Sequence, residues 1–91
     1  MPKLILNMEV KDWDVFNKIY VLGDNINREK AGIKKIFIGH EECKPNKVHA
    51  IFDLPHSKAM REYVESPEVK KMLEDSGIKL ETLGGVVCID Q

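Results

Sequence analysis

The segment Ile33–Leu54 constrains the fold of this chain more than any other, because it predicts a β-hairpin near the middle of the sequence. β-Branched and aromatic residues fill two arms, residues 33–41 and 47–54, and the intervening Glu42–Asn46 contains the turn-forming pair Pro45-Asn46. A helical pattern lies on each side of the hairpin, and a further strand pattern lies beyond each helix. The order β-α-β-β-α-β predicts an α+β domain with a four-stranded antiparallel sheet.

The hydrophobic pattern predicts which residues of the hairpin face each other. Pairing Ile38 with Phe52 gathers the apolar side chains of both arms on one face, whereas a slip of one residue would mix the two faces. The same register places His40 opposite Ala50 on that apolar face. It also brings Glu41 and His49 together on the other face, where a charge pair between strands is expected.

The first strand is expected at Lys3–Val10, where apolar residues occupy every second position. Asp12 is placed to cap the helix that follows, which we expect to continue to Ala31 with a break at Gly23-Asp24-Asn25. Gly32 is the expected helix stop, since glycine adopts the left-handed conformation without steric cost. The apolar residues with helical spacing in this first helical region are Val15, Ile19, Leu22 and Ile26, and they are flanked by Trp13, Phe16 and Tyr20.

The second helical region is expected to start with Ser57 as its N-cap and to bend at Ser66, where a serine, a proline and an acid form a second helix start. Ser76-Gly77 is the expected end of this region. The last strand is expected at residues 82–90, and Gly84-Gly85 within it predicts a bulge or a close approach of two backbones. The expected inner stripe is Ala59, Met60, Tyr63 and Val64, continued by Val69, Met72 and Leu73.

Composition excludes several classes of function. The 91 residues predict one domain spanning 1–91, and a net charge of −1 argues against a nucleic-acid partner, which needs a basic surface. The sequence has no apolar run long enough to span a membrane and no signal-peptide pattern at its start, so we expect a cytoplasmic protein without a membrane partner. Cys43 and Cys88 do not form a Cys-x-x-Cys pair, and two free thiols are expected, with a disulfide between them as the alternative.

Short segments spread over nearly the whole chain resemble the dimeric α/β-barrel superfamily, which is ferredoxin-like, and in particular a small branch near the antibiotic-biosynthesis-monooxygenase-like proteins. The segments that carry this resemblance are Val10-Lys-Asp-Trp13 with Phe16, Arg28-Glu-Lys-Ala-Gly-Ile33, Ser66-Pro-Glu-Val69 and Asp75-Ser-Gly-Ile78. The resemblance implies a ferredoxin-like sheet with its helices on one face and a pocket between the two. It also implies a homodimer in which the sheets of two chains face each other.

The sequence agrees with such a dimer. In an antiparallel sheet with helices on one face, the other face can be exposed to water. Here that second face carries Ile5, Phe37, Ile51 and Val86, and it is therefore more apolar than a free surface should be. A second chain would cover it.

His40 is the candidate for chemistry, because it is expected near the end of a strand at the rim of an apolar pocket. There a histidine could serve as a general base, a haem ligand or an anchor for a carboxylate, or it could only complete local hydrogen bonds. The three histidines share no spacing that suits a metal, so we expect no metal site. The predicted ligand-binding set is Met8, Trp13, Phe16, Tyr20, Ile38, His40, Phe52, Met60, Tyr63 and Met72.

Three functions are compatible with these residues. The first is a protein that binds an apolar or fatty-acid-like molecule between sheet and helices, without a cofactor. The second is a cofactor-free monooxygenase or isomerase of the dimeric α/β-barrel type, with His40 as its base, which is implied by analogy of fold. The third is an interaction protein with a filled core, which predicts no cavity.

Overall fold

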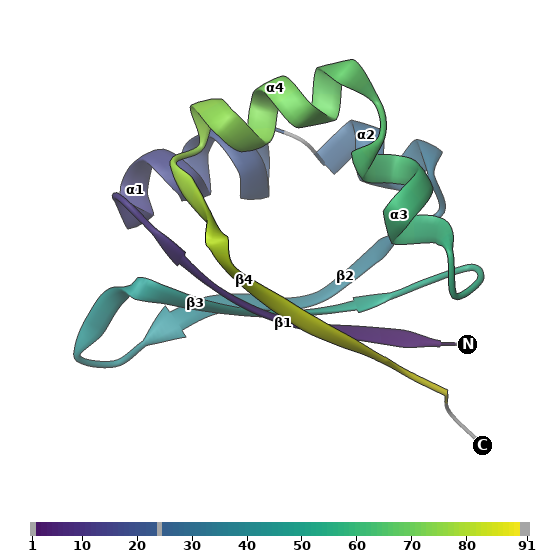
Figure 1. The fold of residues 1–91 in the computed structure, drawn as a ribbon, viewed down its shortest axis with the longest axis horizontal. Helices are drawn as coiled ribbons and strands as arrows, with labels where there is room; N and C mark the ends of the chain where they lie inside the picture. Colours follow the sequence, from purple (N-terminus) through teal and green to yellow (C-terminus); the bar gives the residue numbers. More distant parts are fainter. Residues whose placement is uncertain (1, 24, 90–91) are drawn as a thin grey trace.

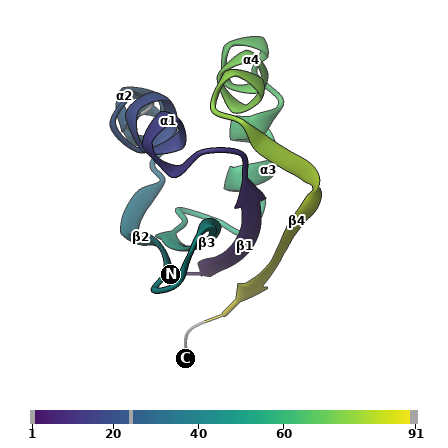
Figure 2. The same cartoon turned by 90° about the vertical axis from the view of Figure 1, so that its left-hand side faces the viewer.

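A four-stranded antiparallel sheet carries all of the described helices on one of its faces (Figure 1). The computed structural model describes residues 2–23 and 25–89, and the strands are ordered β2-β3-β1-β4 across the sheet. Seen from the side, the helices form two neighbouring columns, α1 with α2 and α3 with α4, above the curved sheet (Figure 2). This arrangement confirms the predicted α+β, ferredoxin-like fold. The elements are β1 (Lys3–Val10), α1 (Trp13–Phe16), η1 (Asn17–Leu22), α2 (Asn25–Lys30), β2 (Lys34–Glu41), β3 (Lys44–Asp53), α3 (Ala59–Val64), α4 (Pro67–Asp75) and β4 (Ile78–Cys88).

The core lies between the sheet and the helices. Alternate residues of β1 point into it, so that Leu4 and Met8 are buried whereas Ile5 on the opposite face is 44% exposed. Phe52 and Leu54 are fully buried beside them. The period of two in the sequence therefore predicted correctly which face of the sheet packs against the helices.

The hairpin forms with the predicted faces, but its predicted register was wrong by two residues. Ile38 pairs with Ala50 and His40 pairs with Val48, and the pairing is irregular on both sides of this segment, with an extra residue on β2 after Lys35 and extra residues on β3 opposite the step from His40 to Glu41. The turn consists of Glu42 and Cys43, so that the Pro45-Asn46 pair belongs to the start of β3. A shift of two residues keeps Ile38 and His40 on the predicted face, and it moves His40 toward the turn.

The first helical region begins as predicted and then changes its winding. Asp12 caps α1 by accepting hydrogen bonds from the backbone N–H groups of Asp14 and Val15. The chain then forms η1, a π-helix, whose wider turn brings Tyr20 to the core. The expected stripe was therefore wrong, and Leu22 on it is 68% exposed.

The expected break before α2 is confirmed at its two edges, since η1 ends at Leu22 and α2 starts at Asn25. Asp24, the central residue of that break, lies outside the described residues. Gly32 follows α2 with a φ of 76°, as expected for a helix stop.

The second helical region divides at Ser66 into α3 and α4, as predicted. Lys58, and not Ser57, occupies the N-cap position of α3. Gly77 ends the region with a φ of 81°. The last strand starts at Ile78, earlier than the expected Thr82, and Asp90 at its expected end lies outside the described residues.

Candidate functional site

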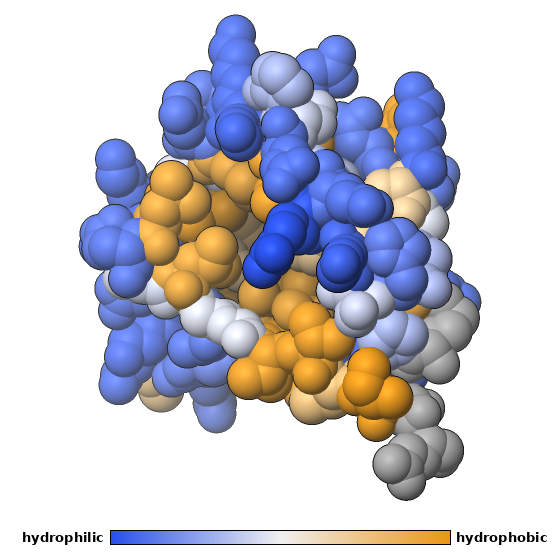
Figure 3. Space-filling model, turned by 45° about the vertical axis from the view of Figure 1, so that its right-hand side comes forward, coloured by the Kyte–Doolittle hydropathy of each residue, from blue (hydrophilic) through white to orange (hydrophobic). Residues whose placement is uncertain are grey.

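The candidate site is an apolar cleft of about 270 Å³ between the helices and the sheet. Figure 3 shows a hollow with hydrophobic atoms on its left and lower sides and hydrophilic side chains along its right and upper sides. The volume of the cleft is well above the roughly 10–15 Å³ that a site needs to hold one water, so side chains leave open space between the sheet and the helices. The cleft is lined by Leu6, Met8, Phe16, Tyr20, Ile38, Ala50, Phe52, Met60, Arg61, Val64, Leu73, Ile78, Leu80 and Leu83.

A bulge in β4 forms one wall of the cleft. The pairing of β1 with β4 shifts between Asn7 and Glu9, so the β4 residues after Lys79 leave the regular ladder until Gly84. Leu80 and Leu83 of this bulge line the cleft, although they are 56% and 45% exposed. The mouth of the cleft therefore presents hydrocarbon to solvent.

Thr82 holds the bulge in place. Its Oγ1 accepts a hydrogen bond from the backbone N–H of Glu9 at 2.8 Å, and its hydroxyl donates to the carbonyl oxygen of Lys79 at 2.6 Å. These two bonds tie the bulged segment to β1 and to its own start. Thr82 thereby replaces part of the backbone ladder that the bulge interrupts.

The helical side of the cleft rests on stacked aromatic rings and a buried arginine. Phe16 and Tyr20 stack with their ring centroids 5.4 Å apart, and both line the cleft. Arg28, which is 1% exposed, donates to the carbonyl oxygens of Tyr20 at 3.0 Å and Val21 at 2.7 Å. Its guanidinium also lies 4.8 Å from the centre of the Tyr20 ring. Arg28 therefore satisfies carbonyls at the end of η1 and holds Tyr20 toward the cleft.

The structure brings together six of the ten residues that the sequence analysis assigned to ligand binding. The six that line the cleft are Met8, Phe16, Tyr20, Ile38, Phe52 and Met60. The other four, Trp13, His40, Tyr63 and Met72, are absent from its lining among the described residues. Ligand binding by any of these ten stays a prediction.

His40 lies outside the cleft, which differs from the predicted position. Because the true register moves it two residues toward the turn, His40 is exposed and borders a shallow hollow with Trp13 and Asp12. Its ring packs edge-on against Trp13, with 4.8 Å between ring centroids. Its Nδ1–H donates to the carbonyl oxygen of Glu41 at 2.9 Å, which leaves Nε2 as the basic atom of the neutral ring.

Tyr63 and Met72 face other surroundings. Tyr63 is buried and borders a surface hollow with Ser66 and Val69, and its hydroxyl has no hydrogen-bond partner among the residues that the structure describes. Met72 is half-buried on α4, whereas the neighbouring Leu73 reaches the cleft.

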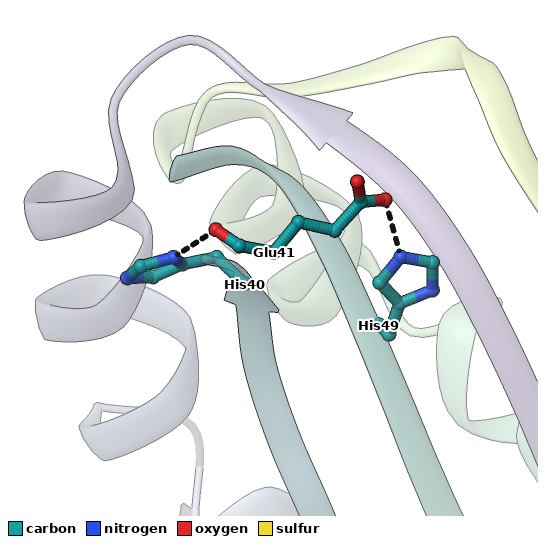
Figure 4. A network of polar contacts seen from close by, with 3 residues as sticks. All are labelled: His40, Glu41 and His49. Carbon is teal, nitrogen blue, oxygen red and sulfur yellow. Dashed lines mark hydrogen bonds and ion pairs between the residues drawn. The ribbon is translucent and has the colours of Figure 1, made fainter. Parts of the chain in front are cut away.

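The expected pair between Glu41 and His49 is confirmed. His49 Nε2–H donates to Glu41 Oε2 at 2.8 Å, and Figure 4 shows the rings of His40 and His49 on either side of Glu41. The hydrogen bond from His49 lowers the pKa of the Glu41 carboxyl below its ordinary value of 4.5. The pair borders a hollow on the outer face of the sheet, together with Asn7 and Lys47.

The predicted ligand-binding set lacks eight of the residues that line the cleft, which are Leu6, Ala50, Arg61, Val64, Leu73, Ile78, Leu80 and Leu83. Leu80 was missed because the last strand was expected to start two residues after it, at Thr82. The irregularity predicted at Gly84-Gly85 is confirmed, since the bulged segment ends at Gly84 and the backbone of Gly85 lies close to Leu6. Arg61 on α3 was missed because a charged residue next to an apolar stripe is usually solvated. Among the described lining residues, Arg61 is the one that carries a charge.

The described residues form neither a metal-binding cluster nor a membrane-spanning helix. Over residues 2–23 and 25–89, no group of three or more histidine, cysteine or acidic side chains is arranged to hold a metal ion. No helix in the same part of the chain is long and apolar enough to cross a membrane.

Solved structures with the same fold cover nearly the full chain. A protein from Nitrosomonas europaea, provisionally assigned as an antibiotic biosynthesis monooxygenase, has 14% identity and a TM-score of 0.73 over 99% of this chain and 98% of its own. SnoaB, a cofactor-independent oxygenase from Streptomyces nogalater, has 13% identity and a TM-score of 0.73 over 99% of this chain and 92% of its own. A nipsnap family protein of unknown function from Agrobacterium tumefaciens has 14% identity and a TM-score of 0.71 over 97% of this chain and 86% of its own.

These similarities establish the fold, which is the one suggested by the resemblance in sequence. No protein-family model matches the chain, and a comparison with curated proteins gave no match. The function must therefore be argued from the cleft itself.

Proposed function

We propose that this chain binds an apolar small molecule, with a fatty-acid-like hydrocarbon body, in the cleft between its sheet and its helices. The observation that carries the proposal is the 270 Å³ cleft, whose described lining is hydrocarbon, thioether or aromatic except at Arg61 and the Tyr20 hydroxyl. Small-molecule sites are concave and mostly apolar, with few polar groups. A volume of this size counts against a filled core, which the purely structural role predicts.

The direct test is binding of the neutral hydrophobic dye Nile red. We expect a blue-shifted emission with one dye per chain, and loss of this emission in Ala50→Phe, because Ala50 is buried in the cleft floor and a phenyl ring would fill the space. Leu22→Phe is the matched control, since Leu22 is 68% exposed and is not part of the cleft. Leu80→Gln makes the cleft wall more polar at an exposed position and should reduce dye binding. It tests the site if Ala50→Phe does not fold.

Equal dye binding by wild type, Ala50→Phe and Leu80→Gln would place the dye elsewhere and refute the proposal. Loss of binding in the Leu22→Phe control would have the same meaning. Native mass spectrometry of the purified protein adds an independent readout, because a bound natural ligand would appear as a mass difference that disappears on denaturation.

We also propose that two copies of the chain associate through the outer faces of their sheets. This face carries Phe37 and Val86, which are 51% and 58% exposed, together with Ile5. Exposed apolar patches of this kind mark interaction sites. Sedimentation of wild type and Phe37→Glu tests this, and a wild-type monomer at high concentration would refute it.

A cofactor-free monooxygenase or isomerase is the second candidate, supported by the shared fold with a cofactor-independent oxygenase. In this reading the unprotonated Nε2 of His40 takes a proton from a substrate that reaches the hollow beside Trp13. Oxygen uptake with phenolic aromatic substrates is the assay for the monooxygenase reading. Full turnover by His40→Ala would remove the proposed base.

A further inference from the structure

Resting on the proposed binding function, we infer that the ligand is an amphiphile with an anionic oxygen head, and that Arg61 selects it at the mouth of the cleft. Arg61 lies in the first half of α3, on the same wall as Met60 and Val64. An arginine in this position packs its aliphatic stem along apolar surface while its guanidinium stays in water. A ligand whose body fills the cleft would bring its head to this guanidinium.

The charge of Arg61 is available for a ligand. In the structure of residues 2–23 and 25–89, neither a hydrogen bond nor an ion pair engages its side chain, and the residue is exposed. The neighbouring Glu62 is already paired, with His56 Nε2 at 3.3 Å from its Oε1. Glu65, four residues along the helix, is the acid that could compete with a ligand for Arg61.

The chemistry of the guanidinium selects the class of head group. Its planar fork donates two parallel hydrogen bonds to a carboxylate or a phosphate, which an ammonium cannot do. The rest of the described lining offers no second charge, so a ligand with charges at both ends would bury one of them in hydrocarbon. The cleft therefore favours a molecule with one apolar body and one anionic end.

The experiment compares ligands that share one chain and differ in their head group. Decanoate, decyl phosphate, decanol and decyltrimethylammonium each displace Nile red from wild type, Arg61→Gln, Arg61→Lys and Lys58→Gln. We expect wild type to bind decanoate about fivefold more tightly than decanol, the scale of one exposed charge pair. The affinity for decyl phosphate, compared with that for decanoate, should show whether the Arg61 guanidinium prefers a phosphate to a carboxylate. Decyltrimethylammonium should bind most weakly of the four ligands.

The variants identify the residue that causes the preference for an anionic head group. Arg61→Gln should bind decanoate and decanol equally while keeping the affinity for decanol, and Arg61→Lys should recover part of the preference. Lys58→Gln is the matched control, because Lys58 is a neighbouring exposed cation outside the cleft lining, and it should behave as wild type. Added salt should reduce the preference of wild type and leave decanol binding unchanged.

Each outcome separates this inference from the binding function. If decanol and decanoate bind wild type equally, or if Arg61→Gln keeps the preference for decanoate, the role of Arg61 is refuted and the cleft remains a binding site. If none of the four ligands displaces the dye and the dye itself does not bind, the proposed function fails first. If Lys58→Gln loses the preference for decanoate over decanol, Lys58 and not Arg61 selects the head group, and the inference is refuted.

Discussion

Replacing Thr82 with valine tests how the wall of the cleft is held. The Thr82 hydroxyl bonds both the amide of Glu9 and the carbonyl of Lys79, and it is the group that joins the bulge to the sheet. Valine has nearly the same shape and lacks the hydroxyl, so the substitution removes both bonds without opening a cavity. The amide of Glu9 and the carbonyl of Lys79 then lose these partners.

The size of the effect follows from the two bonds. An intramolecular hydrogen bond contributes about 0.5–1.5 kcal/mol net, so two bonds give about 1–3 kcal/mol in the free energy of unfolding. Both bonds are partly buried, and water can reach the freed groups, which favours the lower half of this range. For a domain of this size each 1 kcal/mol lowers the Tm by about 4–8 °C. Urea unfolding followed by circular dichroism gives the free energy, and a thermal scan gives the Tm.

Thr82→Ser is the matched control, because serine keeps the hydroxyl and loses only a methyl group. We expect Thr82→Val to be clearly less stable than Thr82→Ser and to bind Nile red more weakly, since Leu80 and Leu83 lose their fixed positions. If the two variants agree within about 0.5 kcal/mol, the usual range for a surface substitution, the hydroxyl does not hold the bulge and the reasoning is refuted.

Three further substitutions have expected outcomes. Gly85→Ala should destabilise the fold by about 1 kcal/mol in urea unfolding, because a Cβ there would overlap the end of the Leu6 side chain, which must then leave its rotamer, and would lie close to the carbonyl oxygen of Ile5. Glu41→Gln should be less stable than wild type at neutral pH, and the difference between their free energies of unfolding should shrink as the pH falls below 4.5. The reason is that the His49 hydrogen bond lowers the pKa of Glu41 in the folded state, so the ionised carboxylate stabilises the fold above that pH and this contribution is lost as the carboxylate is protonated. Arg28→Lys should cost about 1.5–3 kcal/mol in urea unfolding, since one ammonium cannot reproduce the two hydrogen bonds that the guanidinium donates to backbone carbonyls; unchanged stability would refute that role.

The sequence predicted the fold because its periodic patterns depend on burial, which is what the sheet and the helices satisfy. Leu4 and Phe52 point to the core as expected, and Asp12 and Gly32 mark helix ends through local backbone chemistry. The winding of η1 was not predictable in this way, because a π-helix is held by tertiary packing around Tyr20 and by Arg28.

The candidate site was predicted only in part, for a reason that concerns register. A strand pattern tells on which face a side chain lies, but not how far along the sheet it sits. His40 therefore lies on the expected face of the sheet but two residues closer to the turn than predicted, since it pairs with Val48 instead of Ala50. The glycine pair at 84–85 predicted an irregular strand but not which side chains of that strand would face the helices, so Leu83 was not assigned to the cleft. Arg61 was not assigned to it because a charged residue beside an apolar stripe is usually solvated.

One sheet separates the cleft from the exposed apolar face, and its strands contribute alternate residues to both. Leu6 and Ala50 lie in the cleft, while Ile5 and Ile51 next to them point to the other side. A ligand that changes the curvature of β1 and β3 would therefore also reshape the surface where a second chain is proposed to bind. Thermodynamic linkage then requires reciprocity: the factor by which the ligand alters self-association equals the factor by which self-association alters affinity for the ligand.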